Sequence, residues 1–278
     1  MQIVDAVKHA QQQLVESDSA RLDAEILLCS VINCERTYLY THPEQTLSSN
    51  EINSFNELIT QRSAGHPIAH LIKEKEFWSM ALEVTTDTLI PRPETEILVD
   101  AALNRIPKDS SYSILELGTG SGAISIAIAS ERPLTNITAT DIKEGVLKVA
   151  RSNAESHQLN NITFEKADWF DIKNSSTYDL IVSNPPYISN DDPHLKQGDV
   201  RFEPESALVS GNEGLDDLNI IITGAKKHLN TNGWLLLEHG YQQGNVVRQL
   251  LQENNFSTIS TLKDYSDLDR VSVGQCLS

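Results

Sequence analysis

The sequence predicts an α/β fold in which an open sheet of seven strands occupies the last two thirds of the chain. From residue 113 onward, short apolar runs typical of buried strands alternate with longer runs typical of helices. A glycine-rich turn follows the first of these strands, whereas residues 1–72 show helical periodicity and no such turn. We therefore expect a helical bundle over residues 1–72, a β-hairpin linker over residues 73–90 and an α/β domain over residues 91–278.

The first 72 residues carry the marks of several amphipathic helices. Ile3 and Val7 lie on one face of a first helix, and the serines of residues 17–19 and 48–51 are expected to cap the helices that follow. A Gly-x-Pro sequence at residues 65–67 ends the last long helix. We interpret the bundle as a module that recognises a partner. The alternative is a purely structural cap on the larger domain.

His66 and His70 are four residues apart, a spacing that can bind a metal when both residues lie on one helix. Pro67 lies between them and prevents an uninterrupted helix. Since Cys34 gives no recognisable ligand spacing either, we expect no metal site.

A hairpin and a proline-rich segment come next. The strand-like runs at residues 76–78 and 82–84 predict the hairpin. In residues 90–96, two prolines hold the backbone extended, and a proline followed by an acid is typical of the first turn of a helix. We expect a rigid segment that brings Arg92 and Glu94 to a binding site. A plain linker into a helix is the alternative.

Seven apolar runs are expected to form the sheet. They lie at residues 113–117, 137–140, 162–164, 180–182, 233–238, 256–261 and 271–276. The glycine turn follows the first run, Asp141 the second, Asp168 with Trp169 the third, and an Asn-Pro-Pro-Tyr sequence the fourth. Because ligands of open α/β sheets bind at the carboxyl ends of the strands, these residues predict a single site.

The glycine turn and Asp141 favour a cofactor that contains adenosine. Asp141 follows Gly118 by 23 residues, where a carboxylate is expected to bind the ribose hydroxyls. Asp168 and Trp169 offer a carboxylate to an adenine edge and a ring to its face. The turn reads Gly-x-Gly-x-Gly, whereas a dinucleotide turn reads Gly-x-Gly-x-x-Gly and binds a pyrophosphate. S-adenosylmethionine, which has adenosine and no phosphate, fits this pattern.

Asn184-Pro185-Pro186-Tyr187 ends the fourth strand. Two successive prolines remove two backbone donors, so the carbonyl groups of this turn have no sheet partner. We expect the Asn184 side-chain oxygen and the Pro185 carbonyl to accept the two N–H groups of a flat amide, with Tyr187 over its face. A strand that simply ends in prolines is the alternative.

The amino-acid composition limits the classes of molecule that this chain is expected to bind. The chain has 278 residues, of which 39% are hydrophobic, and a net charge of −17, as in an acidic globular protein with a proper core. Because binding a nucleic-acid backbone needs clustered Lys and Arg, the acidity argues against direct nucleic-acid contact. We expect a soluble cytoplasmic protein without a membrane contact, since no basic leader and no run of 18 apolar residues occurs. No apolar excess suggests an obligate interface, which favours a monomer.

Two motifs, residues 116–124 (Glu-Leu-Gly-Thr-Gly-Ser-Gly-Ala-Ile) and residues 184–187, resemble those of class I S-adenosylmethionine-dependent methyltransferases that act on planar nitrogen. Three further stretches, residues 89–96, 203–208 and 238–240, narrow the resemblance to the protein-(glutamine-N5) methyltransferases of peptide chain release factors, together with Gly65-x-Pro67 and residues 76–78. The resemblance covers nearly the whole chain. Lys73 and Ser266 depart from it, since each stands where we expect glycine, in a connection outside the cofactor site.

The resemblance implies a Rossmann-like methyltransferase sheet and methyl transfer from S-adenosylmethionine to the amide nitrogen N5 of the glutamine in a release factor's Gly-Gly-Gln motif. It also implies that the N-terminal helices dock the release factor. The residues expected to bind the cofactor are Gly118, Thr119, Gly120, Ser121, Gly122, Asp141, Asp168, Trp169 and Asn184. Those expected to bind the glutamine are Asn184, Pro185, Pro186 and Tyr187, with Arg92 and Glu94 beside them; Asn184, Pro185 and Tyr187 are the expected catalytic residues.

Three other functions stay open at this point. The enzyme could methylate a glutamine of a ribosomal protein, although residues 91–94 favour the release-factor branch. It could methylate an exocyclic amino group of a nucleic acid, which is flat like an amide, although the net charge of −17 argues against this. A cofactor-binding module without catalysis is the third alternative.

Overall fold

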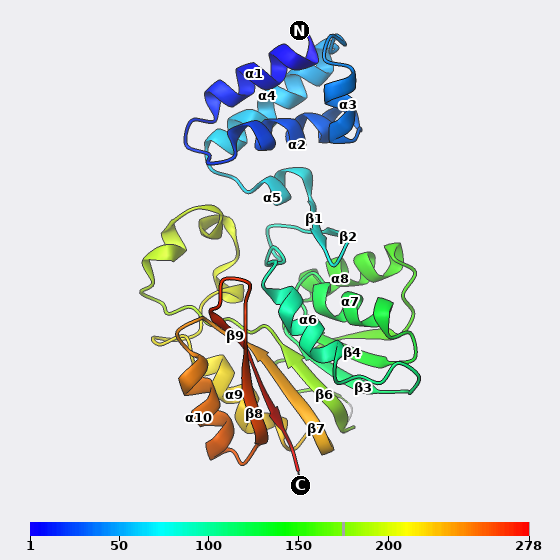
Figure 1. Ribbon diagram of the computed structural model, residues 1–278, viewed down its shortest axis with the longest axis vertical. Helices are drawn as coiled ribbons and strands as arrows, with labels where there is room; N and C mark the ends of the chain where they lie inside the picture. Colours follow the sequence, from blue (N-terminus) through cyan, green and yellow to red (C-terminus); the bar gives the residue numbers. More distant parts are fainter. Residues whose placement is uncertain (174–175, 278) are drawn as a thin grey trace. The chain divides into compact units, whose positions relative to one another are not determined.

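The computed structural model describes residues 1–173 and 176–277. These residues form two compact units, drawn in Figure 1. We name them the helical unit, Met1–Glu74 together with His194–Phe202, and the sheet unit, Lys75–Pro193 together with Glu203–Ser278. The helical unit thus includes a second segment, His194–Phe202, which the sequence analysis assigned to the α/β domain. Within the described residues, no helix combines the length and the apolar character that crossing a membrane needs.

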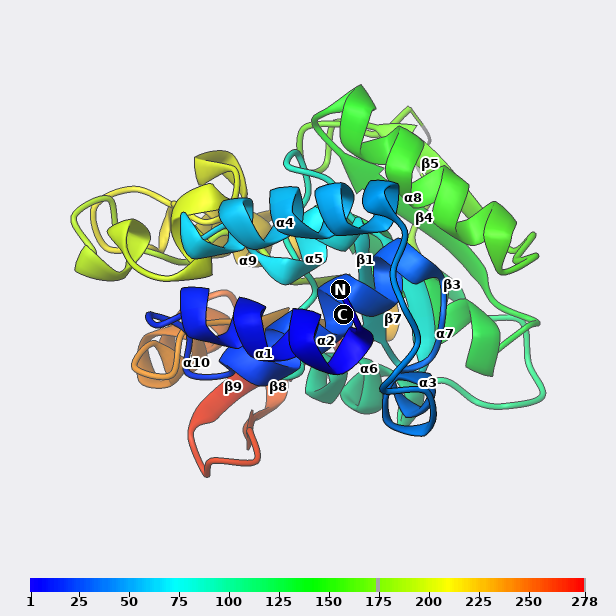
Figure 2. The same cartoon turned by 90° about the horizontal axis from the view of Figure 1, so that it is seen from above.

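The helical unit is built from α1 (Ile3–Gln13), α2 (Ala20–Ile32), α3 (Arg36–Thr41), α4 (Ser49–Ser63) and α5 (Ile68–Ile72). Figure 2 shows α1 and α4 running alongside each other, and both contact α2. Their shared core includes Ile3, Leu27, Leu28, Phe55 and Ile59. The predicted helical character of this part of the chain is therefore confirmed.

One of the two predicted sets of helix caps is confirmed. Ser48 and Glu51 form a capping box at the start of α4, each side chain accepting from the other's backbone N–H. The prediction for residues 17–19 is wrong, because Ser19 precedes α2 without a side-chain cap. Ser17 and Ser19 instead donate to the buried carboxylate of Asp23, each at 2.8 Å, since a buried charge is costly without partners.

Arg62 of α4 connects the segment His194–Phe202 to the other residues of the helical unit. Its Nε donates to Asp23 Oδ2 at 2.7 Å and its Nη1 to Asp199 Oδ1 at 3.1 Å. Arg62 and Asp199 are 137 positions apart in the sequence. No local pattern could have predicted their contact.

The predicted hairpin is present as β1 (Glu74–Phe77) and β2 (Met80–Glu83). Trp78, expected in a strand, lies in the turn, where Trp78 and Ser79 have φ of 52° and 57°. A two-residue turn with positive φ at both positions matches the twist of a hairpin. Lys73 also has a positive φ, of 58°, so this position does require the backbone conformation that glycine adopts most easily.

The sheet unit contains the predicted sheet of seven strands. They are β3 (Ser113–Leu117), β4 (Asn136–Asp141), β5 (Ile162–Lys166), β6 (Tyr178–Ser183), β7 (Leu229–Glu238), β8 (Ser257–Lys263) and β9 (Asp269–Gln275). Their order is β5-β4-β3-β6-β7-β9-β8; β9 runs antiparallel to β7 and β8, and the other pairs are parallel. The strand order reverses at β3 and β6, where open α/β sheets bind their ligands.

Helices cover both faces of this sheet (Figure 1). On one face lie α6 (Thr95–Leu103), α7 (Ala123–Glu131) and α8 (Glu144–Ser156), and on the other α9 (Asp216–Ala225) and α10 (Gly244–Glu253). In β6, Leu180 and Val182 belong to the first core and Ile181 to the second. Because successive strand residues point to opposite faces, a continuous apolar run indicates a strand that is covered on both sides.

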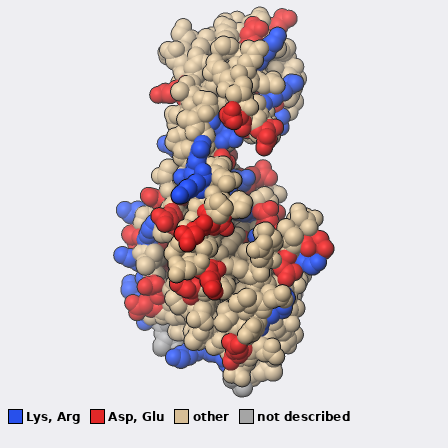
Figure 3. Space-filling view, turned by 90° about the vertical axis from the view of Figure 1, so that its left-hand side faces the viewer, with Lys and Arg blue, Asp and Glu red and all other residues tan. Residues whose placement is uncertain are grey.

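On the face drawn in Figure 3, Asp and Glu side chains are interspersed with Lys and Arg side chains. A mixed surface of this kind supports solubility and gives little attraction for a phosphate backbone.

Candidate active site

A cavity of about 340 Å³ lies at the carboxyl ends of β3, β4, β5 and β6. This volume is typical of small-molecule sites. The predicted site residues that line it are Gly118, Thr119, Gly120, Ser121, Asp141, Asp168, Trp169, Asn184 and Pro186. The predicted site residues that do not line it are Gly122, Pro185, Tyr187, Arg92 and Glu94. One edge of the sheet therefore gathers residues from four separate strand ends.

The glycine turn after β3 presents backbone to this cavity. Gly120 and Gly122 have φ of 56° and 87°, a region that favours glycine. A Cβ on Gly120 would meet no atom within 4 Å, so the backbone here faces open space. A Cβ on Gly122 would lie 3.2 Å from Ala150 Cβ of α8. Gly122 therefore serves the close packing of α7 against α8 rather than the lining of the cavity.

Asp141, at the end of β4, is held by two backbone N–H groups. Its Oδ2 accepts from Gly120 at 3.2 Å and its Oδ1 from Lys143 at 3.0 Å. Burial raises the pKa of this carboxyl, and the two N–H groups act in the opposite direction. Because each carboxylate oxygen can accept more than one hydrogen bond, Asp141 can still bind two neighbouring hydroxyl groups of a ligand.

Glu116, in β3, supports the glycine turn and was not predicted as a site residue. Its Oε2 accepts from the Thr119 hydroxyl at 2.7 Å. Its Oε1 has no hydrogen-bond partner among the described residues, and the side chain is fully buried. Burial raises the pKa of Glu116 to about 7, so the neutral acid is well populated at neutral pH. A glutamate inside an apolar strand was the available signal.

Trp169 contributes an aromatic wall. A Cβ on Gly118 would lie 3.6 Å from the Trp169 ring, which shows how closely the indole packs over the turn. Asp217, in the first turn of α9, lines the same cavity, and burial raises the pKa of its carboxyl. A ring packed over the turn in this way offers a flat apolar surface to another ring.

The Asn-Pro-Pro-Tyr turn (residues 184–187) is held by partners from two other elements. The Asn184 side-chain Nδ2 donates to the Thr95 hydroxyl of α6 at 3.2 Å. The Tyr187 hydroxyl donates to Oε1 of Glu238, at the end of β7, at 3.2 Å. Burial and the neighbouring Glu238 carboxyl raise the pKa of Tyr187, so its hydroxyl is a protonated donor at neutral pH.

Comparison with known proteins decides the family. Residues 5–72 match the model of the PrmC N-terminal domain and residues 108–271 that of a methyltransferase domain. The release factor glutamine methyltransferase of Xylella fastidiosa (strain Temecula1) is 47% identical over 92% of this chain and 93% of its own. That of Shewanella oneidensis is 45% identical over 98% of this chain and 96% of its own. This chain belongs to the release factor glutamine methyltransferase family.

Solved structures place this family member among proteins of the methyltransferase fold. A methyltransferase from Pyrococcus furiosus superposes with a TM-score of 0.55 at 20% identity, covering 80% of this chain and 98% of its own. A 16S rRNA methyltransferase of T. thermophilus, in complex with AdoMet and guanosine, superposes with a TM-score of 0.51 at 18% identity, covering 73% of this chain and 49% of its own. These likenesses concern the fold, and they confirm the predicted methyltransferase sheet.

The cavity fits S-adenosylmethionine, the usual cofactor of this fold. Gly120 leaves room at the backbone, and Asp141 presents two oxygens to vicinal hydroxyls. Trp169, Ile124 and Ile142 supply aromatic and apolar surface for a ring. The residues present thus match a ligand that combines a ribose, a flat base and a short polar chain.

Arg92 and Glu94, two predicted substrate residues, do not line the cavity. The Arg92 guanidinium forms an ion pair with the buried carboxylate of Glu203, which also accepts from the Ile90 N–H at 3.0 Å. Glu94 directly precedes α6 as its N-cap residue. The ion pair therefore connects the proline-rich segment, residues 90–96, to Glu203. Glu203 is the first residue of another stretch, 203–208, on which the family resemblance rests.

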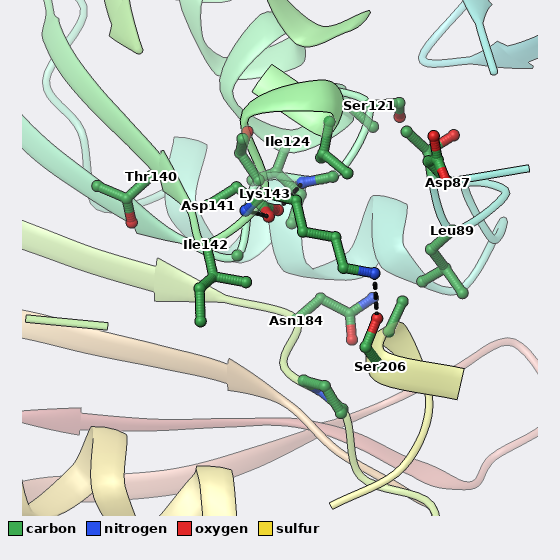
Figure 4. Close-up of a pocket in the computed structure, with 18 of the residues that line it drawn as sticks. Asp87, Leu89, Ser121, Ile124, Thr140, Asp141, Ile142, Lys143, Asn184 and Ser206 are labelled. Carbon is green, nitrogen blue, oxygen red and sulfur yellow. Dashed lines mark hydrogen bonds between the residues drawn. The ribbon is translucent and has the colours of Figure 1, made fainter. Parts of the chain in front are cut away.

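The sequence analysis did not assign several residues that line the cavity, among them Asp87, Leu89, Thr95, Lys143, Ser206 and Asp217. Figure 4 shows Lys143 extending across the cavity, where its Nζ donates to the Ser206 hydroxyl at 2.6 Å. Lys143 follows Asp141 by two positions, which was the one local signal for it. Ser206 lies in a stretch that only the family resemblance singled out.

Proposed function

We propose that this protein transfers a methyl group from S-adenosylmethionine to the side-chain amide nitrogen N5 of the glutamine in the Gly-Gly-Gln motif of peptide chain release factors. The position of Asn184 carries the proposal. Asn184 lines the same cavity as Asp141 and Trp169, and its Nδ2 is bound to Thr95, which leaves its Oδ1 to accept from a substrate. The names of the relatives, which match over nearly their whole length, support the substrate.

In this proposal the cofactor is bound by residues at three strand ends. Asp141 accepts from the ribose hydroxyls, Trp169 stacks on the adenine, and Asp168 accepts at the adenine edge. The backbone of the glycine turn, residues 118–122, contacts the remainder of the cofactor. When bound, S-adenosylmethionine would supply an electrophilic methyl group on a sulfonium, whose sulfur–methyl bond breaks as the methyl group is transferred and leaves the neutral thioether S-adenosylhomocysteine.

The Asn-Pro-Pro-Tyr turn orients the glutamine. The Asn184 Oδ1 and the Pro185 carbonyl accept the two amide N–H bonds and fix the nitrogen in line with the methyl group. Both acceptors also stabilise the positive charge that develops on this nitrogen. Tyr187 covers the amide face and excludes water. The nitrogen loses one proton to solvent after the new N–C bond has formed, so no base has to deprotonate the amide beforehand.

The release factor is the partner in this proposal. The helical unit docks it, which the match of residues 5–72 to the family's N-terminal domain supports. The net charge of −17 and the mixed surface of Figure 3 favour a protein acceptor over a nucleic acid.

The test is transfer of labelled methyl from S-adenosylmethionine to purified release factor. The matched control is the same release factor with alanine in place of the motif glutamine. Ribosomal protein, rRNA and DNA serve as other acceptors. We expect label in the wild-type release factor alone, with mass spectrometry locating the added methyl group on the glutamine. Label in the alanine control, or in another acceptor in its place, would overturn the proposal.

A further inference from the structure

We propose that Thr95 and Glu238 are positioning residues, each of which holds one end of the Asn-Pro-Pro-Tyr turn by a hydrogen bond. We call these two bonds the network. The inference rests on the proposed transfer to glutamine and names the residues that orient the acceptor site. The network joins three elements, since Thr95 begins α6, Glu238 ends β7, and the turn follows β6.

Thr95 sets the orientation of Asn184. A half-turn of the Asn184 amide would exchange its oxygen and nitrogen and would present N–H groups to the N–H groups of the substrate. The Asn184 Nδ2 donates to Thr95 Oγ1 at 3.2 Å, so the observed orientation leaves the oxygen for the substrate. Thr95 is only 4% exposed, and water is therefore a poor substitute for its hydroxyl.

Glu238 also holds the other end of the turn. Its Oε1 accepts from the Tyr187 hydroxyl at 3.2 Å, which fixes the ring that is expected to cover the amide face. Glu238 is 1% exposed. A single buried carboxyl thus holds the ring of Tyr187.

The network uses Glu238 as a hydrogen-bonding group rather than as a charge. Its Oε2 has no hydrogen-bond partner within the described part of the chain. Burial raises the pKa of Glu238 to about 7, with Glu94 acting in the same direction and Arg270 in the opposite one. A glutamine at this position keeps the acceptor oxygen for Tyr187 and has nearly the same shape.

The test compares matched pairs of variants. Thr95→Val removes the hydroxyl and keeps the shape, while Thr95→Ser keeps the hydroxyl. Glu238→Ala removes the carboxyl, while Glu238→Gln keeps an acceptor. We expect kcat for release factor methylation to fall by about 10- to 100-fold in Thr95→Val and Glu238→Ala, and by less than about threefold in Thr95→Ser and Glu238→Gln. The dissociation constant of S-adenosylhomocysteine should change by less than about threefold in all four.

The conservative variants supply the readout that a merely structural role would not change, since Thr95→Ser and Glu238→Gln should retain kcat while the affinity for S-adenosylhomocysteine stays the same in all four variants. If Glu238→Ala does not fold, the Thr95 pair still decides.

Failure of the proposed function and failure of the network give different experimental results. A wild-type protein that does not methylate release factor overturns the proposed function. An active wild type whose Thr95→Val variant keeps the wild-type kcat overturns the network. The same holds if Glu238→Gln loses as much activity as Glu238→Ala, because Glu238 would then act through its charge.

Discussion

Replacing Asp141 by alanine should weaken binding of S-adenosylmethionine by about 10- to 150-fold. The carboxylate lies at the carboxyl end of β4 on the cavity wall, with its two oxygens fixed by the N–H groups of Gly120 and Lys143. Its position is therefore set by the backbone, and little side-chain freedom has to be lost when a ribose binds.

The size of the effect follows from the bonds that are lost. A hydrogen bond to a charged group contributes about 1.5–3 kcal/mol, and each 1.4 kcal/mol changes a dissociation constant about tenfold. The Asp141→Ala variant also leaves the Gly120 and Lys143 N–H groups without their acceptor, although both lie beside the cavity, where water can replace it. We therefore expect the loss to lie within this range.

Isothermal titration with S-adenosylhomocysteine measures the affinity without turnover. Asp5→Ala is the matched control, because it removes the same charge from an exposed position of α1. The control should bind like the wild type. An Asp141→Ala variant with an unchanged dissociation constant would refute the assigned ribose contact, and an equal loss in both variants would trace the effect to net charge.

Three further predictions concern the turn, the fold and pH. Asn184→Ala should lower methyl transfer by about 100-fold while the dissociation constant of S-adenosylhomocysteine changes by less than about threefold; wild-type turnover would contradict this. Gly122→Ala should cost about 1–2 kcal/mol more in urea unfolding than Gly198→Ala, because both glycines have positive φ but only Gly122 has neighbours within 4 Å; equal losses would argue against the packing role. The pKa of Glu238 is raised to about 7, so the folded protein binds this proton more tightly than the unfolded chain, and the associated stability is present at low pH and is lost as the pH rises to about 7. The free energy of unfolding of the wild type should therefore fall relative to that of Glu238→Gln between about pH 5 and pH 8, by up to about 1.4 kcal/mol per pH unit, whereas parallel curves would count against the raised pKa.

The fold could be predicted where a local pattern had one physical meaning. The run Leu180, Ile181 and Val182 is apolar on both faces, which only a covered strand requires, and β6 lies between two helical layers. The serines before α2 had two possible roles, since a hydroxyl can cap a helix or donate to a carboxylate. The serines donate to Asp23, whose carboxylate is buried and also accepts from Arg62, 39 positions away.

The site residues also divide into those that a local sequence pattern indicates and those that it does not. Asp141 and Trp169 could be predicted because each lies at or just after the carboxyl end of a strand, and parallel strands bring their carboxyl ends together. Asp217 could not, because it lies in the first turn of α9 rather than at a strand end. The hydrogen bond between Lys143 and Ser206 joins residues 63 positions apart, and neither residue type in its local sequence indicates the other.

The proline-rich segment shows why residue type alone misdirects such an assignment. Arg92 and Glu94 drew attention because charged side chains often bind ligands, yet the Arg92 charge is neutralised by Glu203. The residue of this segment that contacts the proposed acceptor turn is the uncharged Thr95, bonded to Asn184 from 89 positions away. The Thr95 hydroxyl accepts from the Asn184 Nδ2 at 3.2 Å and so leaves the Asn184 oxygen free to accept from a substrate. One hydrogen bond, rather than a charge, is therefore what this segment contributes to the proposed recognition of a glutamine amide.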